Sequence, residues 1–345
     1  MNRFFKYLQV PFVSKTAYEE HQNKFLFPVI DKKWQEEQEA MMEELKTLGE
    51  GLHIGGDGRA DSPGHSAKYG TYTTMELHLG KVINLQLVQS NEAKNSNWME
   101  LEGLKRSIDC LKSYGVELDA IVTDRHRSVA KWIRENLQET KHYFDIWHVA
   151  KGLGKKLDKL GQTQDCALVK EWKKSIINHL YWCAASTPDG NPEMMFAKWL
   201  SLCNHILGVH DGHSDLFPKC EHGPLAAPRE KKWFKPGEKV TVELEKILTD
   251  TWRKKDVRQL SPLGQTSSLE GFHSTILHFA PKHTSFQYKG MHYRVILAAL
   301  HVNENSGRER AYERSGEKQL TVYFSKAKKG EPSVRWETVA STYGE

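Results

Sequence analysis

The sequence predicts an α/β fold in which a mixed-sheet core is interrupted by an all-α insertion. Strand patterns separated by turns and amphipathic helices fill residues 49–150, whereas residues 151–262 show only helical patterns and many tryptophans. Helical patterns without strands then continue to about residue 310. We therefore divide the chain into five segments. These are a helical lead-in segment (1–48), the first part of the core (49–150), an α-helical insertion (151–262), the last helices of the core (263–310) and a polar, loosely held C-terminal tail (311–345).

The first elements are a helical segment and three strands. Residues 1–48 have a helical pattern with Ser14 as a candidate N-cap. Strand patterns follow over 51–59, 67–80 and 81–89. A turn is expected at Gly80, between the second and the third strand. The simplest arrangement of three successive strands joined by short turns is antiparallel.

A βαβ region completes this half of the core. Residues 97–115 carry apolar side chains at helical spacing, and 118–126 is a buried type of strand. A helix over 128–138 and a strand over 142–149 follow, so the later strands are expected to be parallel. The order β-β-β-α-β-α-β is that of a ribonuclease H-like fold.

The second half of the chain is predicted to be mainly helical. The insertion contains a polar stretch at 208–240, and the whole segment is too long to be a loop. Helices are then expected over 266–282, with Ser267 or Ser268 as the N-cap, and over 290–303. Tryptophans in the insertion have helical spacing, so core packing is favoured over stacking on DNA bases: Trp172, Trp182, Trp199, Trp233 and Trp252.

Composition restricts the class of protein. Five cysteines without CxxC spacing argue against a secreted disulfide framework, and no run of about 18 apolar residues indicates a membrane span. We therefore expect a soluble intracellular protein that does not bind a membrane. Its formal net charge is only +5, but Lys and Arg cluster at 151–159, 170–175, 229–235 and 252–258. Such clusters can follow phosphates, although any one of them can equally be a solvated helix face.

Three acidic residues form the candidate catalytic set. Asp57 and Asp124 each end a predicted strand, and these strands are neighbours in this topology. Glu270 lies in the first turn of the helix after the insertion, where the helix dipole tolerates an anion. Each residue alone has an ordinary explanation, as a turn residue or as a helix-terminal charge. Their joint placement favours a site, with Asp61 as the main rival of Asp57.

Three carboxylates without clustered His or Cys favour a hard cation, either Mg²⁺ or Mn²⁺. Two such ions would stabilise the attacking and leaving oxygens of an in-line phosphoryl displacement. The predicted reaction is therefore metal-dependent hydrolysis and strand transfer at phosphodiesters.

Four longer blocks carry a resemblance to a known family: "GGDGRADSPGHSAKYGTY", "VTDRHRSVAKWI", "HYFDIWHVAKGL" and "SSLEGFHSTIL". With the order Asp57, Asp124, Asp145-x-x-His148, helical insertion and Glu270, the chain resembles DDE-type cut-and-paste DNA transposases of eukaryotes that carry a C/D-x-x-H motif. It looks most like the Kolobok-type branch, whose full-length members carry an N-terminal THAP zinc finger. The resemblance covers about 50–310.

The resemblance implies that the three carboxylates hold the metal ions and that Asp145 and His148 support the site. It also implies double-stranded DNA as substrate, a homo-oligomer when active, and a nuclear location. No zinc-finger spacing occurs in 1–48, so the expected THAP finger is missing. We expect either a fragment or diverged copy, or a protein that depends on another DNA-binding partner.

A second group of side chains suggests zinc. The stretch 203–223 is dense in Cys and His, with Cys203, His210 or His213, Cys220 and His222 as the candidate ligands of a structural ion. The spacing fits no familiar finger, and a polar His-rich loop is the alternative. Candidate DNA contacts are Arg59, His65, Lys68, Arg125, His126, Lys151, Lys155 and Lys156.

Two other functions are compatible with the same pattern. A domesticated transposase-derived protein would bind DNA or protein without cutting it. A free-standing ribonuclease H-like nuclease would need no large insertion. The presence of all three carboxylates favours retained catalysis.

Overall fold

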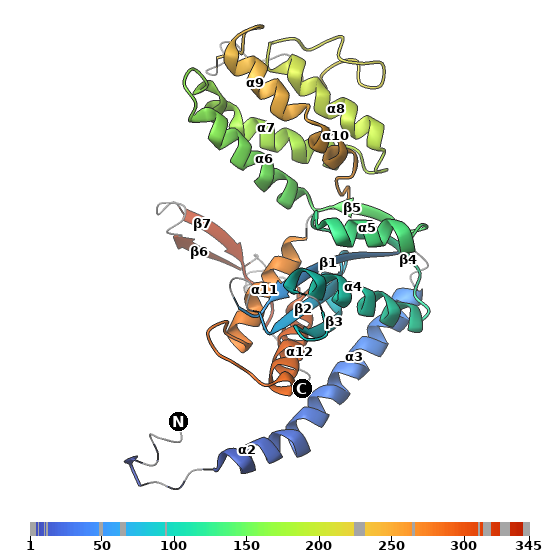
Figure 1. Ribbon diagram of the computed structural model, residues 1–345, viewed down its shortest axis with the longest axis vertical. Coiled ribbons are helices and arrows are strands. Elements are labelled where there is room, and N and C mark those ends of the chain that lie inside the picture. The colour runs from blue at the N-terminus through green and yellow to red at the C-terminus, as the bar shows by residue number, and fades with distance from the viewer. Residues whose placement is uncertain are drawn as a thin grey trace.

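The computed structural model describes residues 5, 7–9, 11, 13–47, 51–62, 67–93, 95–223, 232–263, 266–309, 311–312, 319–324 and 332–340. Figure 1 shows a central sheet with helices on it, a helical insertion at one end, and a long N-terminal helix that extends toward the other end.

A five-stranded mixed sheet forms the centre of the core. Its order is β3-β2-β1-β4-β5, with β1 antiparallel to β2, β2 antiparallel to β3, and β1, β4 and β5 mutually parallel. The strands are β1 (Leu52–Ala60), β2 (Tyr69–Glu76), β3 (Lys81–Gln89), β4 (Leu118–Thr123) and β5 (Lys141–Phe144). The predicted ribonuclease H-like sheet, including the pairing of its first and fourth strands, is confirmed.

Two strand ends differ from the prediction. β1 continues to Ala60, so Asp57 lies within the strand and not at its end. β5 ends at Phe144, whereas the sequence predicted a strand to residue 149. The cause is Asp145, whose side chain accepts a hydrogen bond from the backbone N–H of Trp147 at 3.1 Å and so starts a helix.

Helices cover both faces of the sheet. One face carries α4 (Ser96–Ser113) and α5 (Arg127–Asn136), and their apolar side chains share a core with β1 and β4. The other face carries α11 (Ser267–Phe279) and α12 (Tyr288–Asn305), whose apolar side chains pack with those of β2 and β3. Burial of both apolar surfaces of the sheet supplies the main stabilisation of this core.

The N-terminal helices extend from the core. They comprise α2 (Lys15–His21), a π-helical turn η1 (Gln22–Leu26) and α3 (Phe27–Thr47). The hydroxyl of Ser14 accepts a hydrogen bond from Ala17 N at 3.1 Å, which confirms Ser14 as the N-cap. Only α3 has buried side chains here, because one of its faces packs on the sheet and on α12.

Two amide side chains cover polar backbone groups of the edge strand β3. Asn303 of α12 donates to Val82 O at 2.9 Å and accepts from Val82 N at 2.8 Å. Gln38 of α3 donates to Ile83 O at 2.7 Å. These bonds satisfy backbone groups that would otherwise be left unpaired at the sheet edge.

The insertion is a helical unit with its own apolar core. It contains α6 (Ile146–Gly161), α7 (Leu168–Ala185), α8 (Pro192–His205), α9 (Lys239–Leu248) and α10 (Thr251–Arg258). Trp172 and Trp199 are buried in this core, as predicted from their spacing. Trp252 is 60% exposed, so for this residue the predicted core role is wrong.

The chain leaves and re-enters the core at the same place. The backbone of Phe144 in β5 donates to Gln259 O at 2.6 Å and accepts from Ser261 N at 3.0 Å. The segment after α10 therefore lies beside the strand that precedes α6, and α11 begins close to the carboxyl end of β5. The predicted N-cap of α11 differs by one residue, because Thr266 occupies that position.

The C-terminal segment contains a hairpin that the sequence did not predict. β6 (Leu320–Phe324) and β7 (Pro332–Trp336) pair antiparallel. The hairpin projects from the core on the side of α11 (Figure 1). Across the residues described, no helix combines the length and apolar character that crossing a bilayer requires.

Candidate active site

The two candidate aspartates lie at the same level on neighbouring strands. Gly55 of β1 pairs with Val122 of β4, and Asp57 and Asp124 each follow two residues later. The backbone of His126 donates to Asp124 Oδ1 at 2.7 Å. Burial raises the pKa of Asp124 above its ordinary value, and the charge of Asp57 raises it further, against that hydrogen bond. The two carboxylates are therefore electrostatically coupled.

A further carboxyl group, which the sequence prediction missed, lies beside this pair. Glu100 of α4 packs against Gly58, where an added Cβ would meet Glu100 Cγ at 2.5 Å. Only glycine at this position allows so close an approach. Burial raises the pKa of Glu100 to about 9, and the charges of Asp124 and Asp57 contribute to the increase. A signal was available in the sequence, because Glu100 lies between two apolar residues of the predicted helix, Met99 and Leu101.

Helix α11 reaches the site from the opposite face of the sheet. The ring of His273 lies with Nδ1 3.5 Å from Asp57 Oδ2 and Nε2 3.2 Å from the hydroxyl of Thr73. Glu270 is three residues earlier in the same helix and therefore shares this side of it. The structure thus brings the helix of the third predicted carboxylate to Asp57, by a contact through His273.

The charge of Glu270 reaches the insertion. Together with Asp145 it acts on Tyr181 of α7, whose pKa is raised mainly by burial and further by these two charges. The third carboxylate thus lies toward the insertion.

Asp145 joins three elements through one carboxylate. It is 2% exposed, and its Oδ2 accepts from the hydroxyl of Thr266 at 2.6 Å and contacts His148 Nδ1 at 3.0 Å. Burial alone would raise the pKa of Asp145, but the hydrogen bonds from His148, Thr266 and Trp147 N lower it below its ordinary value. Asp145 is therefore ionised at neutral pH and ties α6 to the start of α11.

His148 is the partner of that carboxylate. The hydrogen bond to Asp145 raises the pKa of His148, although burial opposes the shift, and the charges of Asp57 and Asp124 add to it. Because Nδ1 faces Asp145, the proton on Nδ1 is fixed there. The Asp-x-x-His motif is thus a buried carboxylate that orients a histidine beside the two aspartates.

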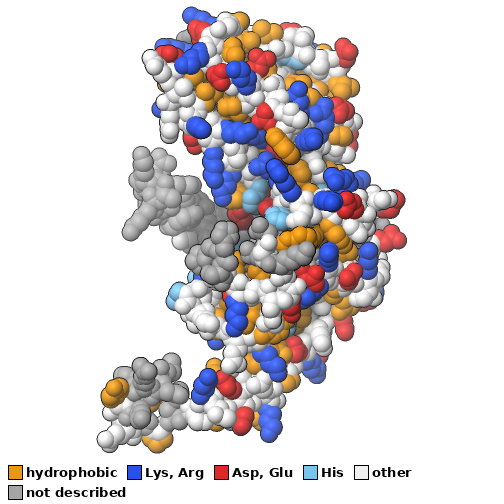
Figure 2. Space-filling model, in the orientation of Figure 1, with side chains coloured by type: hydrophobic (Ala, Val, Ile, Leu, Met, Phe, Trp, Pro, Cys, Tyr) orange, Lys and Arg blue, Asp and Glu red, His pale blue; other side chains and the backbone are white. Residues whose placement is uncertain are grey.

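An open depression exposes part of this arrangement. It has a volume of about 630 Å³, and Asp124, His148 and Trp98 line it together with Arg125 and Arg127. Figure 2 shows Lys and Arg side chains around histidines at the waist between the insertion and the core. An acidic group in a basic depression suits an anionic substrate that is bound together with cations.

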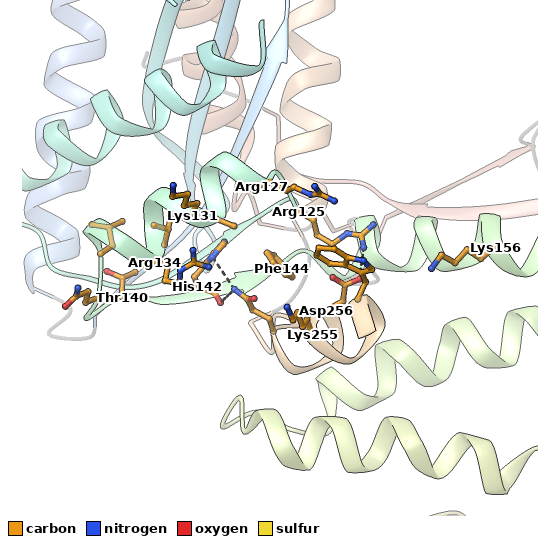
Figure 3. Close-up of a pocket in the computed structure, with 16 residues that line it drawn as sticks. Arg125, Arg127, Lys131, Arg134, Thr140, His142, Phe144, Lys156, Lys255 and Asp256 are labelled. Carbon is orange, nitrogen blue, oxygen red and sulfur yellow. Dashed lines mark hydrogen bonds and ion pairs between the residues drawn. The ribbon is translucent and has the colours of Figure 1, made fainter. Parts of the chain in front are cut away.

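A larger cavity of about 1050 Å³ lies beside this depression, between α5, β5 and α10. Figure 3 shows the basic side chains that surround it. They are Arg125, Arg127, Lys131, Arg134, Lys156 and Lys255. The guanidinium of Arg127 lies 5.1 Å from the ring centroid of the exposed Trp252. The cavity therefore combines positive charge with an exposed aromatic ring, a combination that suits a nucleic acid strand.

Some predicted DNA contacts are on the surface and others are not. Arg59 is only 7% exposed, and burial lowers its pKa. Its predicted role as a phosphate contact stays a prediction. Lys68 is exposed beside Tyr69, whereas His65 lies outside the described residues. Asp61, the rival of Asp57, has a turn role, because its Oδ1 accepts from Lys68 N at 3.1 Å.

The other predicted DNA contacts lie around the depression and along α6. Arg125 forms an ion pair with Asp256 at 2.6 Å, and His126 is the N-cap residue of α5. Lys151, Lys155 and Lys156 are exposed on α6. Lys156 pairs with Asp250 at 2.6 Å. Their predicted role in DNA binding stays a prediction.

The Cys/His stretch of the insertion gathers four side chains, although not the four predicted. The ligand atoms of His205, His210, Cys220 and His222 all lie within 4.8 Å of one another, an arrangement that fits zinc. Cys203 is replaced in this group by His205. The reason is helical geometry, since residues two apart in α8 point in different directions and Cys203 packs against the apolar core. His213 contacts Cys220 from outside the group.

Comparison with curated proteins finds no match. A family model for Mutator-like transposase matches residues 1–217, which is more than half of the chain and includes both aspartates and the Asp-x-x-His motif. Membership implies a DNA-binding protein of the transposase class, a class that generally uses divalent metal ions. The chain therefore belongs to the Mutator-like transposases.

Proposed function

We propose that this transposase cleaves DNA and joins DNA strands with Mg²⁺ or Mn²⁺, through the carboxylates of Asp57, Asp124 and Glu270. The observation that carries the proposal is the coupling of Asp57 and Asp124 on neighbouring strands. Asp124 also lines the basic depression. Two anions held this close repel each other, and a cation removes that repulsion.

The residues around the pair fit such a cation. Oxygen ligands are what Mg²⁺ and Mn²⁺ prefer, and Glu100 adds another carboxyl group whose raised pKa reflects burial near Asp124 and Asp57. When bound, two such ions would lower the pKa of an attacking water and stabilise the charge that develops on the phosphate oxygens. We infer that Asp57, Asp124 and Glu270 hold the ions and that Glu100 supports them.

The chain's own groups account for substrate orientation. His148 is held by Asp145 and is favoured in its protonated form, so it offers a positive charge to a phosphate beside Asp124. Asp145 acts through His148 and Thr266, which makes it a positioning residue. Strain or misplacement of α11 would therefore be transmitted to both His148 and Glu270.

The reaction would proceed in two displacements at phosphorus. Attack by water breaks one P–O bond and leaves a 3′-hydroxyl and a 5′-phosphate. That 3′-hydroxyl then attacks a phosphodiester of the target strand, forms a new P–O bond and releases a 3′-hydroxyl of the target. No side chain forms a covalent bond to DNA in either displacement.

The basic cavity of Figure 3 is proposed to hold the DNA strand next to the cleaved bond. Its basic side chains come from Arg125, from the core helix α5 and from the insertion helices α6 and α10, so DNA bound there would contact both parts of the chain. The exposed Trp252 would stack on a base. The motif blocks support finer assignments, which we also propose. The protein would be a Kolobok-type eukaryotic transposase, and it would act as a homo-oligomer in the nucleus.

The test is nicking of supercoiled plasmid DNA by the full chain with Mg²⁺ or Mn²⁺. We expect activity that requires the metal and is lost in Asp124→Asn. Asp119→Asn is the matched control, because Asp119 lies at the other end of β4 and pairs with His53 and Lys141. Equal nicking by the wild type and Asp124→Asn would refute catalysis at this site.

Strand transfer is tested with a DNA end that carries a free 3′-hydroxyl, with joined products separated on a denaturing gel. DNA binding with neither nicking nor joining would favour the alternative, a domesticated transposase-derived DNA-binding protein. The contact that the structure shows between α11 and Asp57 runs through His273, and this observation keeps the alternative open.

A further inference from the structure

We propose that the insertion contains a structural zinc site formed by His205, His210, Cys220 and His222, independent of the carboxylate site. His205 is the last residue of α8, and the other three belong to the loop that follows it. One thiolate and three imidazoles are ligands that zinc accepts in closed, four-coordinate sites. The proposal rests on how closely and in which direction these groups face one another.

Two of the six separations among the ligand atoms are close to the edges of a zinc tetrahedron. His222 Nε2 lies 3.2 Å from His210 Nδ1, and Cys220 Sγ lies 3.5 Å from His205 Nδ1. Zinc bonds of about 2.0–2.1 Å to nitrogen and about 2.3 Å to sulfur give tetrahedral edges of roughly 3.4 Å and 3.6 Å. All four ligand atoms lie within 4.8 Å of one another, so a small shift would complete the coordination.

Hydrogen bonds around the group orient two of its members. His222 Nδ1 lies 2.8 Å from the carbonyl oxygen of Gly223 and must donate to it, which leaves Nε2 as the nitrogen with a lone pair. That nitrogen is the one that faces His210. A metal-bound histidine characteristically donates its second N–H to a carbonyl in this way.

His213 has the role of an outer partner. Its Nδ1 accepts from Asn204 Nδ2 at 3.1 Å, so its Nε2 carries the proton and lies 3.2 Å from Cys220 Sγ. A donor aimed at the sulfur stabilises a thiolate, which is the form that binds metal. His213 therefore supports Cys220 without entering the group.

The described part of this loop has little apolar burial to stabilise it. Between residues 207 and 223 only Phe217 is buried, and one isolated bridge joins Asp211 and Lys219. A segment with so little apolar burial holds a fixed shape when it is cross-linked. A zinc ion would fasten this loop to the end of α8, next to the aromatic cluster of Trp172 and Trp233.

The experiment measures zinc in the purified full chain after dialysis against a weak chelator. We expect about one zinc per chain. The same amount is expected in Asp57→Asn/Asp124→Asn, because that variant alters only the carboxylate site. Cys220→Ala should lose the zinc. Cys203→Ala is the matched control and should keep it, since Cys203 points into the helical core.

Reconstitution with Co²⁺ gives a second readout. A thiolate-to-cobalt charge-transfer band and tetrahedral d–d bands are expected in the wild type and in Cys203→Ala, and the charge-transfer band should disappear in Cys220→Ser. If the Cys220 variants do not fold, alkylation of Cys220 in the wild type replaces them. Cys220 should be protected by zinc and should react after EDTA treatment.

Three results would overturn the proposal. These are a wild-type chain without zinc, zinc that is retained in Cys220→Ala, and alkylation of Cys220 at the same rate with and without EDTA. Loss of zinc in Asp57→Asn/Asp124→Asn would assign the ion to the carboxylate site. None of these results depends on DNA cleavage, so the zinc site and the proposed catalysis can fail separately.

Discussion

Replacing Glu100 by Gln should stabilise the metal-free protein, and increasingly so as the pH rises. The pKa of Glu100 is raised from 4.5 to about 9, so in the folded state this carboxyl group stays protonated at neutral pH. In the unfolded chain it ionises near pH 4.5. Below pH 4.5 Glu100 is protonated in both states and does not lower the free energy of unfolding. As the pH rises from 4.5 to about 9, the unfolded chain ionises and the free energy of unfolding falls progressively.

The magnitude follows from the width of that interval. At pH 7 the loss spans about 2.5 pH units, which at about 1.36 kcal/mol per unit amounts to on the order of 3 kcal/mol. Gln has the size of the protonated carboxyl group and cannot ionise, so it avoids this loss. In EDTA, urea unfolding of Glu100→Gln should match the wild type at pH 4.5 and exceed it by that amount at pH 7.

Glu102→Gln is the matched control, because Glu102 lies in the same helix but forms a partly exposed ion pair with Arg106. Its effect should stay within about 1 kcal/mol at every pH. Mg²⁺ or Mn²⁺ should raise the stability of the wild type more than that of Glu100→Gln, since a cation favours the ionised carboxylate. Parallel pH curves for the wild type and Glu100→Gln would refute the buried, protonated Glu100.

The remaining predictions concern the motif, the DNA surface and Arg59. A double-mutant cycle of Asp145→Ala and His148→Ala should give a coupling of about 1.5–3 kcal/mol by urea unfolding. The coupling should be largest between pH 3.8 and 6.5, because the lowered pKa of Asp145 and the raised pKa of His148 keep both groups charged there. It should decline at higher pH as His148 loses its proton. A coupling near zero would contradict the contact. Arg127→Ala with Arg134→Ala should weaken DNA binding in fluorescence anisotropy and reduce its salt slope by about 0.9 for each phosphate that is no longer neutralised. An unchanged slope would exclude the cavity as a phosphate site. Arg59→Met should leave DNA affinity unchanged, since Arg59 is buried. A clear decrease in the same assay would show that Arg59 binds a phosphate.

The order of strands and helices in the core could be predicted from the sequence because it depends on local periodicity. Alternation identified the strands, helical spacing of apolar residues identified α4, α11 and α12, and the helix connections made the later strands parallel. The neighbouring positions of Asp57 and Asp124 followed from this topology. The end of β5 did not, because a capping side chain overrides a local strand pattern, as Asp145 does here.

Contacts between residues distant in sequence were decided only by the tertiary structure. The strand pattern around Gly58 gives no sign that Glu100 packs there, and the bond from Thr266 to Asp145 spans 121 residues. The sequence around Arg59 suggests an exposed cation, and only the fold shows that Arg59 is buried. His205 joins the Cys/His group because α8 ends at this residue, where the following loop folds back. The sequence by itself determined the strands and helices of the core and the placement of Asp57 and Asp124 on neighbouring strands. Burial and pKa depend on which chains cover a group, and therefore only the fold decided them.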